Sequence, residues 1–166
     1  MPKLHPAVLA AALLFPGAAL AQAPQAPPPM FAEADAEAAK AVIHRYFAAF
    51  TAQDYGAFRE LFNTPYVMGG RSLNALPTLD DVTRQYQGIR DAVGKQDYSA
   101  SRAANIRIEP LSGTSALAHT HWERLKRDGS LLNEGAEVLM MTKVDGRWRI
   151  TGVLPEDLRQ FRAASR

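Results

Sequence analysis

The chain has 166 residues, of which 11 are Gly, 11 are Pro and none is Cys. It is 47% hydrophobic and 22% charged, which is typical of one globular domain and excludes an intrinsically disordered protein. The lack of Cys excludes a disulfide framework, a cysteine nucleophile and a thiolate metal site. A net charge of +2 is too small to indicate nucleic-acid binding.

Residues 1–21 predict a secretory signal peptide. Lys3 is followed by an apolar run over residues 7–15, and Ala19-Leu20-Ala21 offers a small-x-small cleavage site. The run is about half of the roughly 20 residues that a transmembrane helix needs, so we expect no stable membrane span. We therefore expect a periplasmic or secreted protein. The proline-rich residues 22–31 predict an extended linker.

The first element predicted after the linker is a helix over residues 33–53. Apolar side chains recur there at steps of three and four, which places them in one stripe along a helix. The members of this stripe are Ala39, Val42, Ile43, Tyr46, Phe47 and Phe50. Asp54 suits the N-cap of a short second helix, which we expect Pro65 to end.

A hairpin and a third helix are predicted next. Residues 66–68 and 71–76 flank Gly69-Gly70, a pattern that favours a hairpin turn. Thr78 and Asp81 resemble a capping box, which predicts the start of a third helix that extends to about residue 95.

Four strands follow, over residues 98–108, 115–127, 131–144 and 147–154. Asp128-Gly129 and Asp145-Gly146 are typical of two-residue hairpin turns, so the last three strands should form an antiparallel meander. Residues 156–166 are expected to be a C-terminal tail with a loose helix. Helices followed by a meander predict an α+β fold with one domain over residues 32–155.

This order of elements resembles the nuclear transport factor 2-like superfamily. The resemblance rests on Val42 to Phe50 leading into Asp54-Tyr55, and on the closing segment Asp145-Gly146-Arg147-Trp148. The SnoaL-like and ketosteroid isomerase-like branches are the most similar. The resemblance implies a cone-shaped fold, with three N-terminal helices on a curved, mostly antiparallel sheet. It also implies an open cavity and a homodimer.

The resemblance transfers one functional group of the isomerase branch. Those enzymes carry a tyrosine directly after an arginine in the first helix as an oxyanion donor, and Arg45-Tyr46 matches that pattern. The position of their general base falls on Gly70 here, and that of their acidic hydrogen-bond donor falls near Met140.

A second polar group lies on the strand over residues 115–127. His119, His121 and Glu123 alternate with other residues and therefore share one face of this strand. If Asp128-Gly129 is the turn, Glu123 pairs with Glu134 across the hairpin, and directly opposed carboxylates repel unless a proton or a cation lies between them. This face is a plain or dimer-facing surface, a polar cavity wall, or a metal site made by the two histidines and one glutamate.

The favoured interpretation is an exported protein of uncharacterised role, with neither a cofactor nor a metal. It binds a small apolar or amphipathic molecule in a cavity, or acts as a dimeric module. The expected cavity lining is Tyr46, Phe50, Phe58, Tyr66, Met68, Tyr86, His119 and Met140. The alternative is a SnoaL-like lyase, isomerase or hydrolase with Tyr46, His121 and Glu123 as its catalytic residues, assisted by His119. The alternative requires these side chains to face one cavity.

Overall fold

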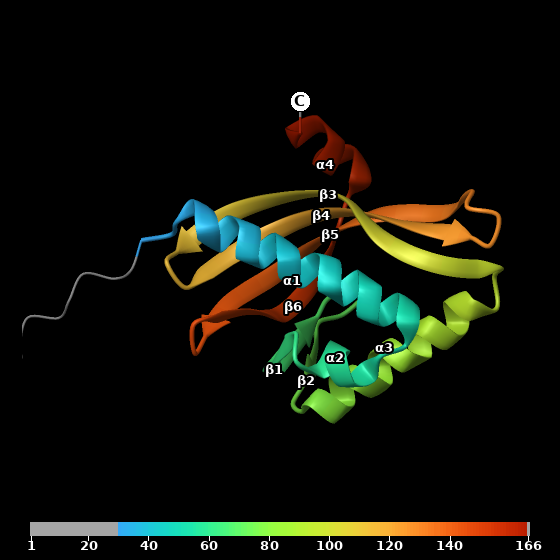
Figure 1. Cartoon of the computed structure of the whole chain (residues 1–166), viewed down its shortest axis with the longest axis horizontal. Coiled ribbons are helices and arrows are strands. Elements are labelled where there is room, and N and C mark those ends of the chain that lie inside the picture. Colours follow the sequence, from blue (N-terminus) through green and yellow to red (C-terminus); the bar gives the residue numbers. More distant parts are fainter. Residues whose placement is uncertain (1–29, 166) are drawn as a thin grey trace, which may run out of the picture.

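A computed structural model describes residues 30–165 of the chain. The predicted signal peptide and all but the last two residues of the predicted linker lie outside these described residues. The described residues form four helices and six strands, whose arrangement can be followed in Figure 1. Their bounds are α1 (Glu33–Ala52), α2 (Tyr55–Arg59), β1 (Phe62–Met68), β2 (Asn74–Leu76), α3 (Leu79–Gly94), β3 (Tyr98–Ser112), β4 (Ser115–Lys126), β5 (Leu131–Val144), β6 (Arg147–Glu156) and α4 (Leu158–Ala164).

The six strands form one curved, open sheet in the order β2-β1-β6-β5-β4-β3. All neighbouring strands are antiparallel except β1 and β6, which are parallel. Helix α1 lies across the face of the sheet that we call the inner face, and α3 packs at the end of the sheet near β1 and β2 (Figure 1). Helix α4 contacts β4 and β5 on the opposite, outer face. No helix among the described residues is long and apolar enough to cross a membrane.

The α+β class and the meander are confirmed, and so are both predicted Asp-Gly turns. The resemblance implied three N-terminal helices; within residues 30–165, α1 and α2 precede the first strand and α3 follows the β1–β2 hairpin. The prediction that Pro65 ends the second helix is wrong, because α2 ends at Arg59 and Pro65 lies within β1. The cause is tertiary: Phe62 is already paired with Ile150 of β6.

The two edges of the sheet differ in length. Strand β2 has only three residues, whereas β3 has 15 and continues through Pro110 to Ser112. Proline is tolerated there because β3 is an edge strand with a partner on one side only. The register of β3 against β4 shifts at three places, after Tyr98, Ala103 and Pro110. The predicted end of this strand at residue 108 is therefore too early.

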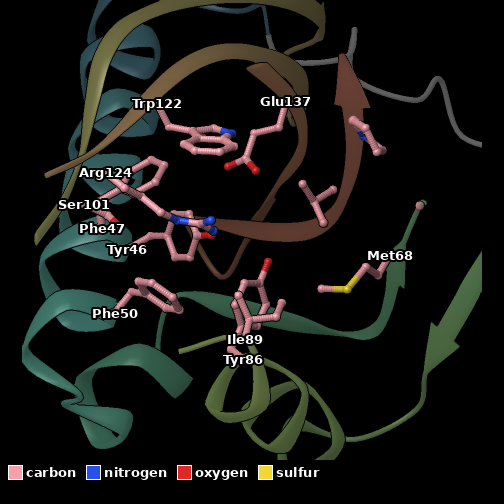
Figure 2. Close-up of a pocket in the computed structure, with 13 residues that line it drawn as sticks. Tyr46, Phe47, Phe50, Met68, Tyr86, Ile89, Ser101, Trp122, Arg124 and Glu137 are labelled. Atoms are coloured by element: carbon pink, nitrogen blue, oxygen red, sulfur yellow. The ribbon is translucent and has the colours of Figure 1, made fainter. Parts of the chain in front are cut away.

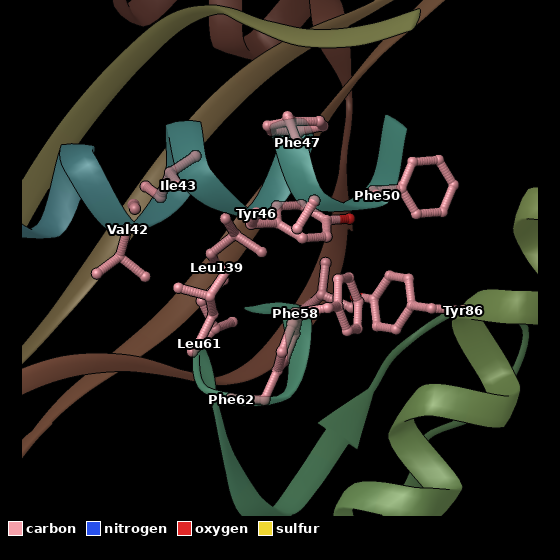
Figure 3. Packing of buried hydrophobic residues seen from close by; sticks show 14 of the residues in the cluster. Val42, Ile43, Tyr46, Phe47, Phe50, Phe58, Leu61, Phe62, Tyr86 and Leu139 are labelled. Carbon is pink, nitrogen blue, oxygen red and sulfur yellow. The ribbon is translucent and has the colours of Figure 1, made fainter. Parts of the chain in front are cut away.

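The core beneath α1 is built mainly from aromatic rings. The ring of Tyr46 of α1 packs against Phe58, Phe62 and Tyr86, and that of Phe50 packs against Tyr86 (Figure 3). The ring centroids of Phe58 and Phe62 lie 4.5 Å apart, and those of Phe58 and Tyr86 lie 5.0 Å apart. Tilted and edge-on pairs at such distances stabilise a core beyond the burial of their area. This cluster fixes the face of α1 that meets the sheet.

Asp35 attaches the first turn of α1 to the end of the sheet formed by β5 and β6. Its Oδ1 accepts hydrogen bonds from Lys143 Nζ at 2.6 Å and from Trp148 Nε1 at 3.1 Å. The backbone N–H of Ala32 donates to Oδ2 at 3.2 Å. The hydrogen bond from Lys143 is the largest of the effects that lower the pKa of Asp35 from 3.8 to about 2, followed by those from Ala32 and Trp148. The folded state therefore favours the ionised carboxylate.

Asp35→Asn should destabilise the domain in a pH-dependent way. A carboxyl whose pKa is lowered on folding contributes stability above its unfolded pKa, and this stability is lost as the pH falls toward its folded pKa. We expect the difference in free energy of unfolding between wild type and Asp35→Asn to be largest at pH 7 and to shrink between pH 3.8 and about pH 2. Urea unfolding of both proteins at several pH values measures this difference in free energy. Glu33→Gln, an exposed acid of the same turn, is the control, and an equal pH dependence of both variants would contradict the assignment.

Candidate functional site

The inner face contains a pocket of about 230 Å³ between the sheet, α1 and α3. Figure 2 shows the side chains around it. Its aromatic lining consists of Tyr46, Phe47, Phe50, Tyr86 and Trp122. The rest of the lining is Met68, Gly69, Ile89, Ser101, Arg124, Glu137, Val153 and Pro155. The pocket is therefore mostly apolar, with one carboxyl, one guanidinium, two phenols and one serine among its walls.

Trp122 forms the sheet side of the pocket, and Gly135 makes its position possible. The two residues are direct cross-strand partners, and the indole ring lies directly against the glycine. A Cβ atom at position 135 would overlap the six-membered ring of Trp122. Glycine is therefore required here for a close approach of a side chain to the backbone.

Glu137 is the one acid in the lining. Its Oε1 atom is shut off from solvent and has no hydrogen-bond partner among the described residues. Burial raises the pKa of this carboxyl from 4.5 to about 7, against the opposing effect of the Arg124 charge. A group with this pKa exchanges its proton near neutral pH, which is the range that general acid–base chemistry uses.

Arg124 is the one cation in the lining. Its Cζ atom lies 4.6 Å from the ring centroid of Trp122, a cation–π contact. No hydrogen bond or ion pair joins its guanidinium to any described residue, whereas Arg102 on the outer face is paired with Glu123. The pocket thus contains a half-buried positive charge without a counter-ion.

Tyrosine hydroxyl groups complete the polar side of the pocket. The hydroxyls of Tyr66 and Tyr86 are 2.7 Å apart and share a hydrogen bond in the core behind the pocket wall. Burial raises the pKa of Tyr46 and of Tyr86 well above the ordinary value of 10.0. Both phenols therefore stay neutral at physiological pH and keep their O–H as a hydrogen-bond donor.

The structure brings together half of the predicted cavity lining. Tyr46, Phe50, Met68 and Tyr86 line the pocket. Phe58 and Tyr66 lie in the core behind it and are fully buried, because the aromatic cluster closes over them. Placing His119 and Met140 in the lining is wrong: they lie on the outer face, because each shares its strand face with His121 rather than with Trp122.

The predicted pairing across the β4–β5 hairpin is confirmed, with Glu123 opposite Glu134 and His121 opposite Ala136. The two carboxylates are held by other residues on the outer face. Glu134 accepts hydrogen bonds from His121 and from Arg162 of α4, both at 2.8 Å, and these lower its pKa. Glu123 is paired with Arg102 at 2.6 Å. The arginines therefore relieve the repulsion that the sequence predicts.

Ligand atoms of His121, Glu123 and Glu134 lie within 4.8 Å of one another. One imidazole and two carboxylates form a donor set that suits a divalent cation such as Zn²⁺. Such a cation would compete with Arg102 and Arg162 for the same oxygens. The other histidine of the predicted group, His119, is hydrogen-bonded to Glu156 at 2.9 Å and lies outside this set.

The sheet separates Tyr46 from the other predicted catalytic residues. Tyr46 lines the inner pocket, whereas His121 and Glu123 lie on the outer face. The geometry therefore does not support chemistry that combines them. The polar groups that do share the pocket with Tyr46 are Tyr86, Ser101, Arg124 and Glu137, and of these only Tyr86 was predicted. Strand alternation was sufficient to find Glu137, because an outward Glu134 requires residue 137 to face inward.

The pocket, the helix across it and the open curved sheet define a domain of the nuclear transport factor 2-like class. Residues 35–158 match the family model described as NTF2-like protein (DUF6841), and the chain belongs to this family. No protein of curated function matches the sequence.

Solved structures with the same fold share little sequence with the chain. A protein of unknown function with a cystatin-like fold from Nostoc punctiforme is 10% identical, with a TM-score of 0.65 over 77% of this chain and 94% of that chain. An NTF-2 like protein of unknown function from Shewanella oneidensis is 18% identical, with a TM-score of 0.58 over 74% and 98%. A ketosteroid isomerase-like protein from Erwinia carotovora is 16% identical, with a TM-score of 0.54 over 74% and 95%. These similarities establish the fold alone.

Gly135→Ala should displace Trp122 and change the pocket. The added methyl group overlaps the indole ring, so the ring must move away from β5 and into the cavity. We expect a shifted tryptophan emission spectrum and a loss of stability of about 1–3 kcal/mol, as is usual for overpacking. Fluorescence together with urea unfolding measures both effects. Gly88→Ala adds a methyl group to an open position of α3 and serves as control. A spectrum unchanged by Gly135→Ala would contradict the packing described.

Proposed function

We propose that this domain binds a small, mostly apolar molecule in the inner pocket and contacts its polar group with Glu137 and Arg124. One observation carries this proposal: five aromatic residues line a cavity whose wall holds, near the half-buried Arg124, a buried Glu137 oxygen that has no hydrogen-bond partner among the described residues. Buried polar atoms without partners are costly in free energy, so natural proteins rarely leave them unless a ligand or water satisfies them.

The size and shape of the pocket limit the ligand. Drug-sized ligands usually occupy roughly 300–1,000 Å³, so a cavity of about 230 Å³ suits a molecule built on one ring. Flat aromatic walls favour a flat apolar body. Export and homodimer formation stay predictions, and binding in this pocket requires neither of them.

Proton transfer on the bound molecule is a second candidate function. It is favoured by the pKa of Glu137, which lies at about 7 in the same pocket as the neutral phenols of Tyr46 and Tyr86. In that case Glu137 accepts or returns the proton, and a phenol donates a hydrogen bond to the oxygen on which charge develops. Binding without turnover separates the first candidate from the second.

Filling the pocket should abolish binding of a small aromatic probe. In Met68→Trp the larger side chain occupies part of the cavity, whereas Leu111→Trp places the same indole on the exposed edge strand β3. Calorimetric titration with phenol or benzyl alcohol should give binding to wild type and to Leu111→Trp, and at least about tenfold weaker binding to Met68→Trp. Equal affinity of the two variants, or no binding to wild type, would contradict the proposed function.

Native mass spectrometry of the purified full chain tests the same proposal without a chosen probe. We expect an excess mass of small-molecule size on wild type, and its loss in Met68→Trp. An excess mass that persists in Met68→Trp would place the ligand elsewhere.

A further inference from the structure

We propose that the pocket selects small monoanionic carboxylates with a ring-shaped apolar body, for which Arg124 is the counter-ion and Glu137 a hydrogen-bond donor. This inference rests on the proposed function and names its ligand class. It goes beyond the apolar or amphipathic molecule that the fold and the aromatic lining suggest.

Arg124 has no counter-ion among the described residues. Charges withdrawn from water are normally paired, because the loss of hydration must be compensated. Even Arg102 and Arg162, which are exposed on the outer face, have counter-ions, namely Glu123 and Glu134. Arg124 is half-buried against Trp122 but has no hydrogen-bonding partner among the described residues. Figure 2 shows its side chain reaching into the pocket below Trp122 and Glu137.

The groups around Glu137 determine whether its carboxyl is ionised. Four titratable groups face it from the surrounding elements, namely Arg124 of β4, Tyr46 of α1, Tyr86 of α3 and Tyr66 of β1. The phenols are neutral, and Arg124 alone favours the ionised carboxyl. Burial outweighs that effect and raises the pKa to about 7. Below this pH Glu137 is largely protonated and does not neutralise Arg124.

Arg124 and a protonated Glu137 together suit a carboxylate ligand. A planar guanidinium binds a carboxylate with two parallel hydrogen bonds, and a protonated carboxyl can donate a third. A ligand carboxylate would therefore supply the missing partner of both Arg124 and Glu137. A protonated amine would be repelled by Arg124, and a neutral ring would leave its charge without a counter-ion. The apolar ring of the ligand then lies among the aromatic side chains of α1 and α3.

The geometry also fixes the direction of a pH effect. As the pH rises above about 7, Glu137 ionises, repels a bound carboxylate and competes for Arg124. A bound carboxylate in turn stabilises the protonated form of Glu137, so binding near pH 7 takes up a proton. Carboxylate affinity should therefore fall with rising pH, whereas the affinity of a neutral ring should stay constant.

The experiment is calorimetric titration of the purified full chain with benzoate, benzamide and benzylamine at pH 6 and pH 8.5. We expect benzoate to bind wild type at least about tenfold more tightly than benzamide at pH 6, and to lose about tenfold in affinity at pH 8.5. Arg124→Gln should remove the preference for benzoate. Glu137→Gln keeps a hydrogen-bond donor without a titrating group, so benzoate binding should persist and lose its pH dependence. Arg102→Gln, on the outer face, is the matched control.

Each outcome has a separate meaning. Benzamide binding as tightly as benzoate to wild type at pH 6, or benzylamine binding more tightly, would overturn the inference and leave the ring-binding function in place. Binding of none of the three probes, together with no effect of Met68→Trp on phenol binding, would overturn the proposed function itself. These tests need only wild type and Met68→Trp. They therefore test both the ligand class and the proposed function even if Arg124→Gln fails to fold.

A stability profile gives a readout that is independent of any ligand. Folding raises the pKa of the Glu137 carboxyl from 4.5 to about 7. The folded protein therefore becomes less stable as the pH rises from 4.5 to about 7. The free energy of unfolding of wild type should therefore fall over this range relative to that of Glu137→Gln. Parallel profiles would show that Glu137 titrates normally and would overturn its role as a donor.

Discussion

The alternation of side chains along β4 determines what the polar groups of this domain can do. Trp122 and Arg124 face the inner pocket, whereas His121 and Glu123 face outward and are held in ion pairs and hydrogen bonds. A shift of one residue in the pairing with β5 would exchange these two sets completely. The turn at Asp128-Gly129 sets the register, and outer-face pairs such as His121–Glu134 hold it. The pocket therefore depends on contacts made on the opposite side of the sheet.

Two glutamates of β5 show that the environment alone can shift the pKa values of identical side chains in opposite directions. Glu134 lies on the outer face, where hydrogen bonds from His121 and Arg162 lower its pKa. Glu137 is three residues further on and faces the pocket, where burial raises its pKa to about 7. The side chains are chemically identical, so only the face of the strand and the neighbours it provides distinguish a structural ion pair from a titrating group.

The sequence predicts local features of this fold well and its long-range features less well. The aromatic stripe of α1, the capping box at Thr78 and the two Asp-Gly turns depend on neighbouring residues, and all are present. The parallel pairing of β1 with β6 joins residues far apart in the chain, and it is what ends α2 early. Tyr46 could be predicted in the site because it belongs to a stripe. Strand alternation places Glu137 and Arg124 on the inner face, but their burial depends on the helices that pack across that face.

The long edge strand β3 has a consequence for the behaviour of the chain at high concentration. A regular edge strand offers a row of free backbone groups on which another copy can add a strand. Strand β3 interrupts that row with three register shifts and a proline, and the other edge is only the three-residue β2. The irregularities that adapt β3 to the curved sheet thus also remove a template for edge-to-edge aggregation.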